Sequence, residues 1–166
     1  MYDGSPVNNN RHLLCLSGHP LPSYLFGYQI LLMEIDKLNW EETLGIRHKV
    51  LWPNEDVSYC KVAGDESALH FGVKYNDVRV CVASIYTNGH STRLRKFATL
   101  AEYQGKGVGT FMLNYLIGEL RVAECNSVWL DARVSAIGFY TRFGFKQEGE
   151  GFFKNGVAYC RMKLYF

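Results

Sequence analysis

The segment Gln104-Gly105-Lys106-Gly107-Val108-Gly109 places three glycines between two regular elements. The apolar run 94–101 before it is typical of a strand, and the amphipathic run 110–124 after it predicts a helix. Glycine lets the backbone adopt a positive φ and approach a ligand closely. The first amides of a helix lack internal acceptors and lie at the positive end of the helix dipole. The segment therefore predicts a strand, a turn and a helix that together bind a phosphate or pyrophosphate.

The sequence before the glycines predicts three antiparallel strands. Leu69–Tyr75 and Val78–Tyr86 are strand-like, and Asn76-Asp77 between them tolerates the positive φ of a tight hairpin. A second turn at Asn88-Gly89 leads into the strand Thr92–Ala101. This order argues against a Rossmann dinucleotide site, because the glycines of that site normally follow the first strand of a βαβ unit.

The sequence after the glycines predicts a parallel strand pair and a closing hairpin. A strand at Val128–Leu130 follows the helix 110–124, and a strand-helix-strand unit requires it to pair in parallel with the strand at 92–101. A second helix, Val134–Arg142, ends at Gly144. The closing strands are Phe145–Glu148 and Ala158–Tyr165, with a turn at Asn155-Gly156. The predicted fold class is therefore α/β, with a mixed sheet flanked by helices.

The chain divides near residue 33. Residues 1–10 are polar and residues 17–22 are a breaker cluster, so we expect 1–32 to be an irregular, mostly disordered N-terminal arm, in which residues 24–32 could dock on the core. Residues 33–166 form the predicted domain, which opens with a strand at Ile35–Leu38. Asn39 and Glu42 then fit a capping box for a helix that ends at Leu51, before Trp52-Pro53.

The composition fits one globular domain. Of 166 residues, 48% are hydrophobic, which is enough for a substantial core, and the net charge is only +2. No block of like charges is present, so we do not expect a nucleic-acid partner, which would require a concentrated basic face.

Cysteine usage and hydropathy indicate a cytoplasmic protein. The five cysteines are odd in number and never form a C-x-x-C pair, so we expect buried free thiols rather than a metal site or a disulfide framework. Free thiols suit a reducing compartment. No stretch reaches the ~20 apolar residues of a membrane span, and the first ten residues lack the basic charge of a signal peptide.

Two segments resemble the motifs of one known family. Residues 95–110 resemble the acetyl-CoA signature of the GNAT superfamily of N-acetyltransferases, Gln/Arg-x-x-Gly-x-Gly/Ala after the fourth strand. Residues 136–145 contain Tyr140 and end in Gly144-Phe145, and they resemble the second motif of that family. The resemblance covers about residues 33–166. It implies a mostly antiparallel sheet that splays between the strands at 92–101 and 128–130.

The resemblance implies that acetyl-CoA is the co-substrate and that its pyrophosphate binds at the glycine segment. It also implies a β-bulge near Thr99 and Leu100 that turns backbone groups toward the pantetheine. The cofactor-binding residues it implies are Thr99, Leu100, Gln104, Gly105, Lys106, Gly107, Val108, Gly109 and Thr110. Arg133 stands where the family often has an asparagine, which is a departure from the pattern.

The reaction that the resemblance implies is attack of an amine on a thioester, without a metal. The amine must lose its proton, since a lysine-like amine titrates near ~10.4. A backbone N–H near Leu100 is the candidate to stabilise the oxyanion. Tyr140 is implied as the acid for the leaving thiolate, with a tyrosine that merely packs the core as the structural alternative.

The general base is not fixed by the sequence. Some family members use a glutamate on the fourth strand, but Arg93 or Leu94 stands at that place here. Asp131, which follows a buried strand beside the expected slot, is our first candidate. Glu102 and His70 are the others, and deprotonation through water is equally compatible with the sequence.

The expected acceptor is a small amine. Arg47 could bind its carboxylate, His70 is a further candidate, and Phe152 suggests a partly apolar wall. Acetylation of a protein lysine or N-terminus, or acyl-CoA sensing without catalysis, are the alternatives. A homodimer is left open by the sequence.

Overall fold

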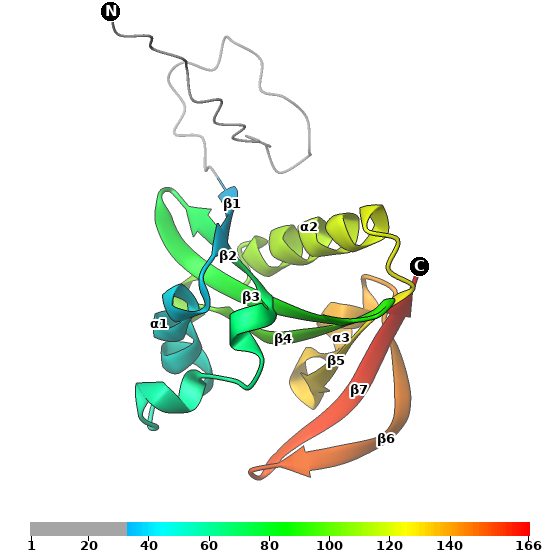
Figure 1. Ribbon diagram of the computed structural model, residues 1–166. Coiled ribbons are helices and arrows are strands. Elements are labelled where there is room, and N and C mark those ends of the chain that lie inside the picture. Colours follow the sequence, from blue (N-terminus) through cyan, green and yellow to red (C-terminus); the bar gives the residue numbers. More distant parts are fainter. Residues whose placement is uncertain (1–32) are drawn as a thin grey trace, which may run out of the picture.

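The computed structural model describes residues 33–166 of the chain, so the predicted arm 1–32 lies outside the described residues. One seven-stranded sheet has the spatial order β1-β2-β3-β4-β5-β7-β6 (Figure 1). The strands are β1 Met33–Leu38, β2 Leu69–Tyr75, β3 Val78–Asn88, β4 Ser91–Thr99, β5 Ser127–Arg133, β6 Lys146–Lys154 and β7 Val157–Tyr165. Only β4 and β5 pair in parallel, and every other neighbouring pair is antiparallel. The predicted mixed, mostly antiparallel α/β class is therefore confirmed.

Helices cover both faces of the sheet. The helices are α1 Trp40–Leu51, α2 Val108–Val122 and α3 Ile137–Thr141, with 3-10 turns η1 Val57–Cys60, η2 Asp65–Ser67, η3 Ala101–Tyr103 and η4 Val134–Ala136. Ile46 of α1 packs on Val82 and Ala98 on one face, here called the α1 face. The α2 helix packs its apolar side on the opposite face, where each fully buried aliphatic side chain contributes about 1.5–3 kcal/mol.

Local sequence signals set most element boundaries. The Asn39 N–H donates to Glu42 Oε2 at 2.9 Å, as expected for the capping box at the start of α1. Asn76 and Asp77 have φ values of 49° and 63°, which is the geometry of the tight β2–β3 turn predicted for them. Asn88 instead belongs to β3 and pairs with Ser91, so the next turn begins one residue later than predicted.

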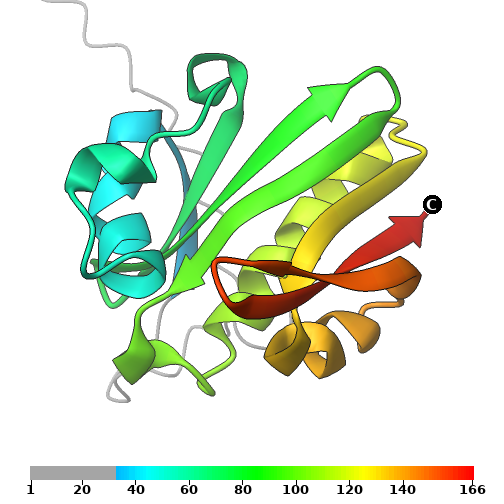
Figure 2. The same ribbon diagram turned by 90° about the horizontal axis from the view of Figure 1, so that it is seen from below.

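The sheet splays between β4 and β5, as the resemblance implied. Their parallel pairing covers only Ser91–Arg93 opposite Ser127–Trp129, although both strands continue beyond it. Figure 2 shows the two strands diverging into a V, with the β6–β7 hairpin beside β5. Beyond Arg93, the edge of β4 that faces β5 therefore has no strand partner, and its backbone groups are open to a ligand.

The β-bulge on β4 lies earlier than predicted. Ser84 pairs with Arg95 and Val82 pairs with Ala98, so Lys96 and Phe97 together oppose the single residue Ala83. Lys96 has a φ of 54°, which produces the bulge. The prediction of a bulge near Thr99 and Leu100 was wrong by about three residues, because regular pairing has already resumed at Ala98 and Thr99.

The extra residue at the bulge reverses the face of the sheet on which each later side chain of β4 lies. Leu94, before the bulge, packs in the α2-face core, whereas Ala98, four residues later, packs on the α1 face. Without the bulge, two residues separated by four positions would face the same side. Phe97 consequently packs in the α2-face core, and Lys96 lies on the α1 face, where its Nζ is 3.7 Å from the centroid of the Trp52 ring.

Four cysteines lie in the described part of the chain, and all are buried free thiols as predicted. They are Cys60, Cys81, Cys125 and Cys160. Within residues 33–166, no helix is long and apolar enough to cross a membrane.

Candidate active site

The predicted glycine segment forms a loop that ends in the first turn of α2. Gly105 and Gly107 have φ values of 72° and 82°, a conformation that is strained for other residues. A Cβ added at either glycine would meet nothing within 4 Å, so the backbone here is open to an approaching group. No acidic residue lies in 104–110. These features suit a bound phosphate.

The N-terminal amides of α2 complete this loop. Within the described residues, the first of them with a backbone acceptor is that of Phe111, which donates to the Gly107 carbonyl at 2.9 Å. The amides of 108–110 precede it and lie at the positive end of the helix dipole. Gly109 allows close packing, since a Cβ there would lie 3.5 Å from Phe139. The predicted residues 104–110 therefore form one continuous loop with a geometry that suits an anion.

The side chains of Gln104 and Lys106 contact the protein around the loop. Gln104 Nε2 donates to the Thr99 carbonyl at 3.0 Å, which ties the loop to the end of β4. The Lys106 Nζ lies 5.2 Å from the centroid of the Tyr103 ring, and Lys106 is exposed. Gln104 thus positions the loop, and Lys106 adds positive charge beside it.

Tyr140 lies on α3, and its ring packs toward Phe97 of β4. Its ring centroid is 5.1 Å from that of Phe139, 5.7 Å from that of Phe145 and 6.5 Å from that of Phe97. Burial raises the pKa of Tyr140 above its usual range, and the nearby Cys81 adds to this effect. The phenol therefore stays protonated and acts as a hydrogen-bond donor more readily than as an acid.

The Leu100 amide does not fit its predicted role. It donates to the Val80 carbonyl at 2.9 Å, so it is already used and is not free to stabilise an oxyanion. The Thr99 hydroxyl similarly donates to Cys81 Sγ at 3.2 Å. The bulge at Lys96 and Phe97, where one residue is left outside the regular ladder, is the better source of a free backbone donor.

Asp131, the first candidate for the base, lies in an ion-pair cluster. Its Oδ2 is 2.7 Å from both Arg93 and Lys154, and its Oδ1 is 3.4 Å from Arg161. Although partial burial acts in the opposite direction, the hydrogen bond and charge of Lys154, with the charges of Arg93 and Arg161, lower the pKa of Asp131. A carboxylate made less basic in this way is poorly suited to accept a proton from an amine.

Glu102, the second candidate, is exposed on η3. It lines a cavity of about 420 Å³ between α1, the start of β3 and η3, on the side of β4 away from β5. The structure thus places Glu102 and Asp131 in separate regions. In the described part of the chain, neither carboxylate forms a hydrogen bond or an ion pair with Tyr140.

Arg47 and His70 form a buried network instead of an acceptor site. The Arg47 guanidinium is fully buried and forms a two-pronged ion pair with Asp65, at 2.7 Å and 3.0 Å. It also donates to Ser84 Oγ at 2.8 Å. His70 donates from Nε2 to the Asp65 carbonyl at 2.8 Å, and its Nδ1 lies 2.8 Å from Ser84 Oγ. The predicted substrate contacts of Arg47 and His70 are therefore corrected, because neither polar group reaches a surface.

Phe152 keeps a place near the splayed strands. It is half-buried on β6 and stacks on Tyr159, with ring centroids 6.1 Å apart and an interplanar angle of 10°. Lys154, which pairs with Asp131, lies 4.9 Å above the Phe152 ring. Phe152 thus forms an apolar platform next to the ion-pair cluster.

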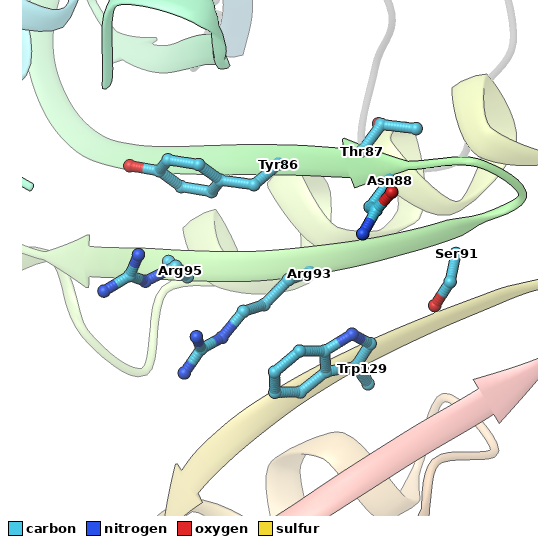
Figure 3. A pocket seen from close by; sticks show the side chains of 7 residues that line it. All are labelled: Tyr86, Thr87, Asn88, Ser91, Arg93, Arg95 and Trp129. Carbon is cyan, nitrogen blue, oxygen red and sulfur yellow. The ribbon is translucent and has the colours of Figure 1, made fainter. Parts of the chain in front are cut away.

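A cleft on the α1 face of the splayed strands was not predicted from the sequence. It has a volume of about 310 Å³ and is lined by Tyr86, Thr87, Asn88, Ser91, Arg93, Arg95 and Trp129. Figure 3 shows Arg93 and Arg95 extending along the cleft, with Tyr86 on β3 and Trp129 on β5 as its aromatic walls. The alternation of Arg93 and Arg95 along an apolar strand was the sequence signal, since such residues share one face.

The fold and site together define a class of protein. A mixed sheet that splays beside a glycine loop at a helix N-terminus is the arrangement implied above for acetyltransferases. The acetyltransferase (GNAT) domain family matches residues 52–166 of this chain. An uncharacterized N-acetyltransferase of Bacillus subtilis, YitI, is 30% identical over 136 residues, which cover 76% of this chain and 91% of that protein.

Solved structures show the same fold at lower sequence identity. The ribosomal-protein-S18-alanine N-acetyltransferase of Escherichia coli is 19% identical, with a TM-score of 0.67 over 80% of this chain and 93% of that one. The PaiA N-acetyltransferase of Thermoplasma acidophilum, solved with coenzyme A, is 15% identical, with a TM-score of 0.65 over 81% and 99%. The chain therefore belongs to the GNAT family of acetyltransferases.

Proposed function

We propose that this protein transfers an acetyl group from acetyl-CoA to the primary amine of a small molecule. The observation that carries the proposal is the continuity of the unpaired β4 edge with the glycine loop at the start of α2. A pyrophosphate bound to the amides of 105–110 leaves the pantetheine arm to run along that edge as an added strand. The coenzyme A in the Thermoplasma relative supports this choice of co-substrate.

The residues at the divergence of the strands provide the chemistry. The backbone at the bulge, Lys96-Phe97, donates to the carbonyl oxygen on which negative charge develops. Tyr140 donates a hydrogen bond to the leaving sulfur. Complete proton transfer from an ordinary phenol (pKa ~10) to a thiolate (pKa of the thiol ~8.5) is uphill by about 2 kcal/mol, and the raised pKa of Tyr140 increases this cost.

Deprotonation of the amine proceeds through water in this proposal. The low pKa of Asp131 argues against it as the base, and Glu102 lies in a different cavity. The α1-face cleft opens on the same divergence of β4 and β5 and holds the acceptor. A protein N-terminus is the second candidate acceptor, because the structurally similar Escherichia coli protein is a ribosomal-protein-S18-alanine N-acetyltransferase.

The test is release of coenzyme A from acetyl-CoA over a panel of small amines and N-terminal peptides. We expect turnover of at least one small amine. Tyr140→Phe should lower kcat about 10- to 100-fold, the value of a hydrogen bond to a charged group, with unchanged coenzyme A affinity. Tyr115→Phe is the matched control, since Tyr115 is half-buried on α2 away from β4.

The outcomes separate the alternatives. Tight coenzyme A binding without turnover of any amine would support an acyl-CoA sensor. Turnover of peptides alone would favour the N-terminal acceptor. Absence of coenzyme A affinity in calorimetry would refute every version of the proposal.

A further inference from the structure

The three cationic side chains of β4, from Arg93, Arg95 and Lys96, lie on one face of the sheet. Arg93 and Arg95 alternate with the buried Leu94, so both extend to the α1 face. Regular alternation would send Lys96 to the opposite face, but its φ of 54° turns its side chain to the α1 face as well. The bulge thus brings two adjacent cations, Arg95 and Lys96, to the same side.

Arg95 and Lys96 contact aromatic rings rather than acids. The Arg95 guanidinium lies 5.1 Å from the centroid of the Tyr86 ring, and the Lys96 Nζ lies over Trp52. Among residues 33–166, neither side chain forms an ion pair with a carboxylate. Both are half-buried. Their charges are consequently only partly hydrated and are not neutralised by the protein.

The neighbouring carboxylates already have hydrogen-bond or ion-pair partners within the protein. Asp65 accepts from Arg47, from the Val62 N–H at 2.8 Å and from the Tyr86 hydroxyl. Asp131 is shared by Arg93, Lys154 and Arg161.

Around the cleft, Asp65 and Asp131 therefore lie among six cations of the described chain. The six are Arg47, Arg93, Arg95, Lys96, Lys154 and Arg161.

The ionisation of these groups reflects the excess positive charge. Burial, followed by repulsion from Arg93, lowers the pKa of Arg95. Burial, followed by repulsion from Arg95 and Arg47, lowers the pKa of Lys96 to about 8. An anion bound between them would supply the missing opposite charge.

We propose that the acceptor amine carries a carboxylate, which Arg95 binds in the α1-face cleft with additional attraction from Lys96. This inference rests on the proposed acetyl transfer and specifies its acceptor. The planar guanidinium matches a carboxylate with two parallel hydrogen bonds. The cleft volume of about 310 Å³ is at the lower end for small-molecule sites, so the acceptor is of amino-acid size.

The aromatic walls orient the acceptor between the two charges. Tyr86 is fixed by its hydrogen bond to the buried Asp65, and Arg95 lies over its ring. Trp129 is held between Arg93 and Arg161, at 4.3 Å and 4.4 Å. The carboxylate end is thereby held toward Arg95, and an apolar spacer lies along the ring edges with its amine directed to the bulge at Lys96-Phe97, where the thioester carbonyl is proposed to lie.

The test compares ω-amino acids, from β-alanine to 6-aminohexanoate, with their amides and with aminoalkyl phosphonates of equal length. For the best chain length, we expect kcat/KM to be about 10- to 100-fold higher for the carboxylate than for the amide. Arg95→Gln should abolish this preference, because kcat/KM for the carboxylate falls to the value for the amide. Arg95→Lys should retain part of it, and Arg121→Gln, an exposed arginine on α2, is the matched control.

A binding measurement tests the carboxylate site even if the protein acetylates no amine. Pentanoate and pentanamide are titrated into coenzyme A-saturated protein by calorimetry, after circular dichroism confirms the folding of each variant. Tighter binding of pentanoate, lost in Arg95→Gln, supports the carboxylate site even if no amine reacts, in which case the proposed transfer fails separately. The inference is overturned if pentanoate and pentanamide bind with equal affinity. It is also overturned if kcat/KM is equal for the carboxylate and the amide, or if the phosphonate is preferred.

Discussion

The backbone conformation of Lys96 determines which side chains of β4 lie on each face of the sheet. Because it takes a φ of 54°, Phe97 joins the α2-face core beside Tyr140 while Lys96 itself joins Arg95 on the α1 face. Lysine has no special preference for this conformation, so the bulge could not be predicted from its identity. The glycines at 105 and 107 were predictable, since they tolerate the positive φ that the structure gives them.

Gly107→Glu should remove coenzyme A binding while the fold is retained. A Cβ added at Gly107 meets no atom within 4 Å, but the glutamate introduces negative charge at the N-cap of α2, where phosphate is expected. The residue must also hold a φ of 82°, which costs about 1–2 kcal/mol. We expect at least a tenfold loss of coenzyme A affinity in calorimetry.

Gly149→Glu is the control for that strain. Gly149 has a φ of 70° on β6, and a Cβ there also meets nothing within 4 Å. The control should lose similar stability and keep full coenzyme A affinity. Equal loss of affinity in both variants would show that strain, rather than charge at the loop, is responsible.

At the scale of elements, Asp131 ties four strands together at the point where the sheet splays. It lies on β5 and contacts Arg93 of β4, Lys154 of β6 and Arg161 of β7. The backbone pairing of β4 with β5 ends at Arg93 and Trp129, so the Arg93–Asp131 ion pair adds a side-chain link beyond the last backbone pair. The sequence placed Asp131 beside the slot but gave no sign of its three partners, which lie 23 to 38 residues away.

Asp131→Asn should lower stability more than catalysis. The side chain is 8% exposed, and its loss leaves three cations repelling one another, which we expect to cost about 1–3 kcal/mol after allowance for their exposure. Denaturant unfolding at pH 7 measures this loss. A drop in kcat of more than about 100-fold, with stability unchanged, would restore Asp131 as the general base.

The stability difference should also depend on pH. The folded-state pKa of Asp131 is lowered, so its contribution is present above the unfolded value, near ~3.9, and is lost as pH falls through the folded value. The gap between the wild type and Asp131→Asn should therefore be constant at neutral pH and narrow below about pH 4. A gap that persists in acid would mean that the ion pairs do not cause it.

Element boundaries were predicted best where local chemistry determines them. The turns at Asn76-Asp77 and Asn155-Gly156 adopt the positive φ values that such residues allow. The strand β6 was predicted to end at Glu148, but it continues to Lys154. Its register with β7 shifts after Glu148, and the sequence of that stretch is typical of a loop. Its pairing with β7 overrides that local signal.

At the scale of the whole molecule, the buried network around Arg47 joins α1, η2, β2 and β3. Arg47 contacts Asp65, His70 and Ser84, which lie 18, 23 and 37 residues further along the chain. No local pattern marks such a network, and a lone arginine on a helix is ordinarily expected at the surface. The sequence therefore predicted the glycine loop that the structure contains, whereas it placed Arg47 and His70 at an acceptor site although long-range packing buries them in this network.

A chain of residues 33–166 should fold and bind coenzyme A with unchanged affinity. All seven strands, the glycine loop and the α1-face cleft come from these residues. Thermal unfolding should be a single transition within about 2 °C of the full chain, a shift that corresponds to less than about 1 kcal/mol for a domain of this size. A truncated chain that is insoluble or lacks coenzyme A affinity would place part of the domain before Met33.

The burial of every described cysteine has a practical consequence for such measurements. Cys60 and Cys81 are 0% exposed, Cys160 is 2% and Cys125 is 7%, and burial raises the pKa of Cys81 to about 12. A thiol that is both covered and un-ionised reacts with a disulfide reagent only when the chain transiently opens. In the chain 33–166, which lacks Cys15, labelling of the cysteines in the native state would therefore be slow. The reagent would then measure only the thiol of released coenzyme A. The same labelling, followed over hours, would report the free energy of opening of the core around each sulfur.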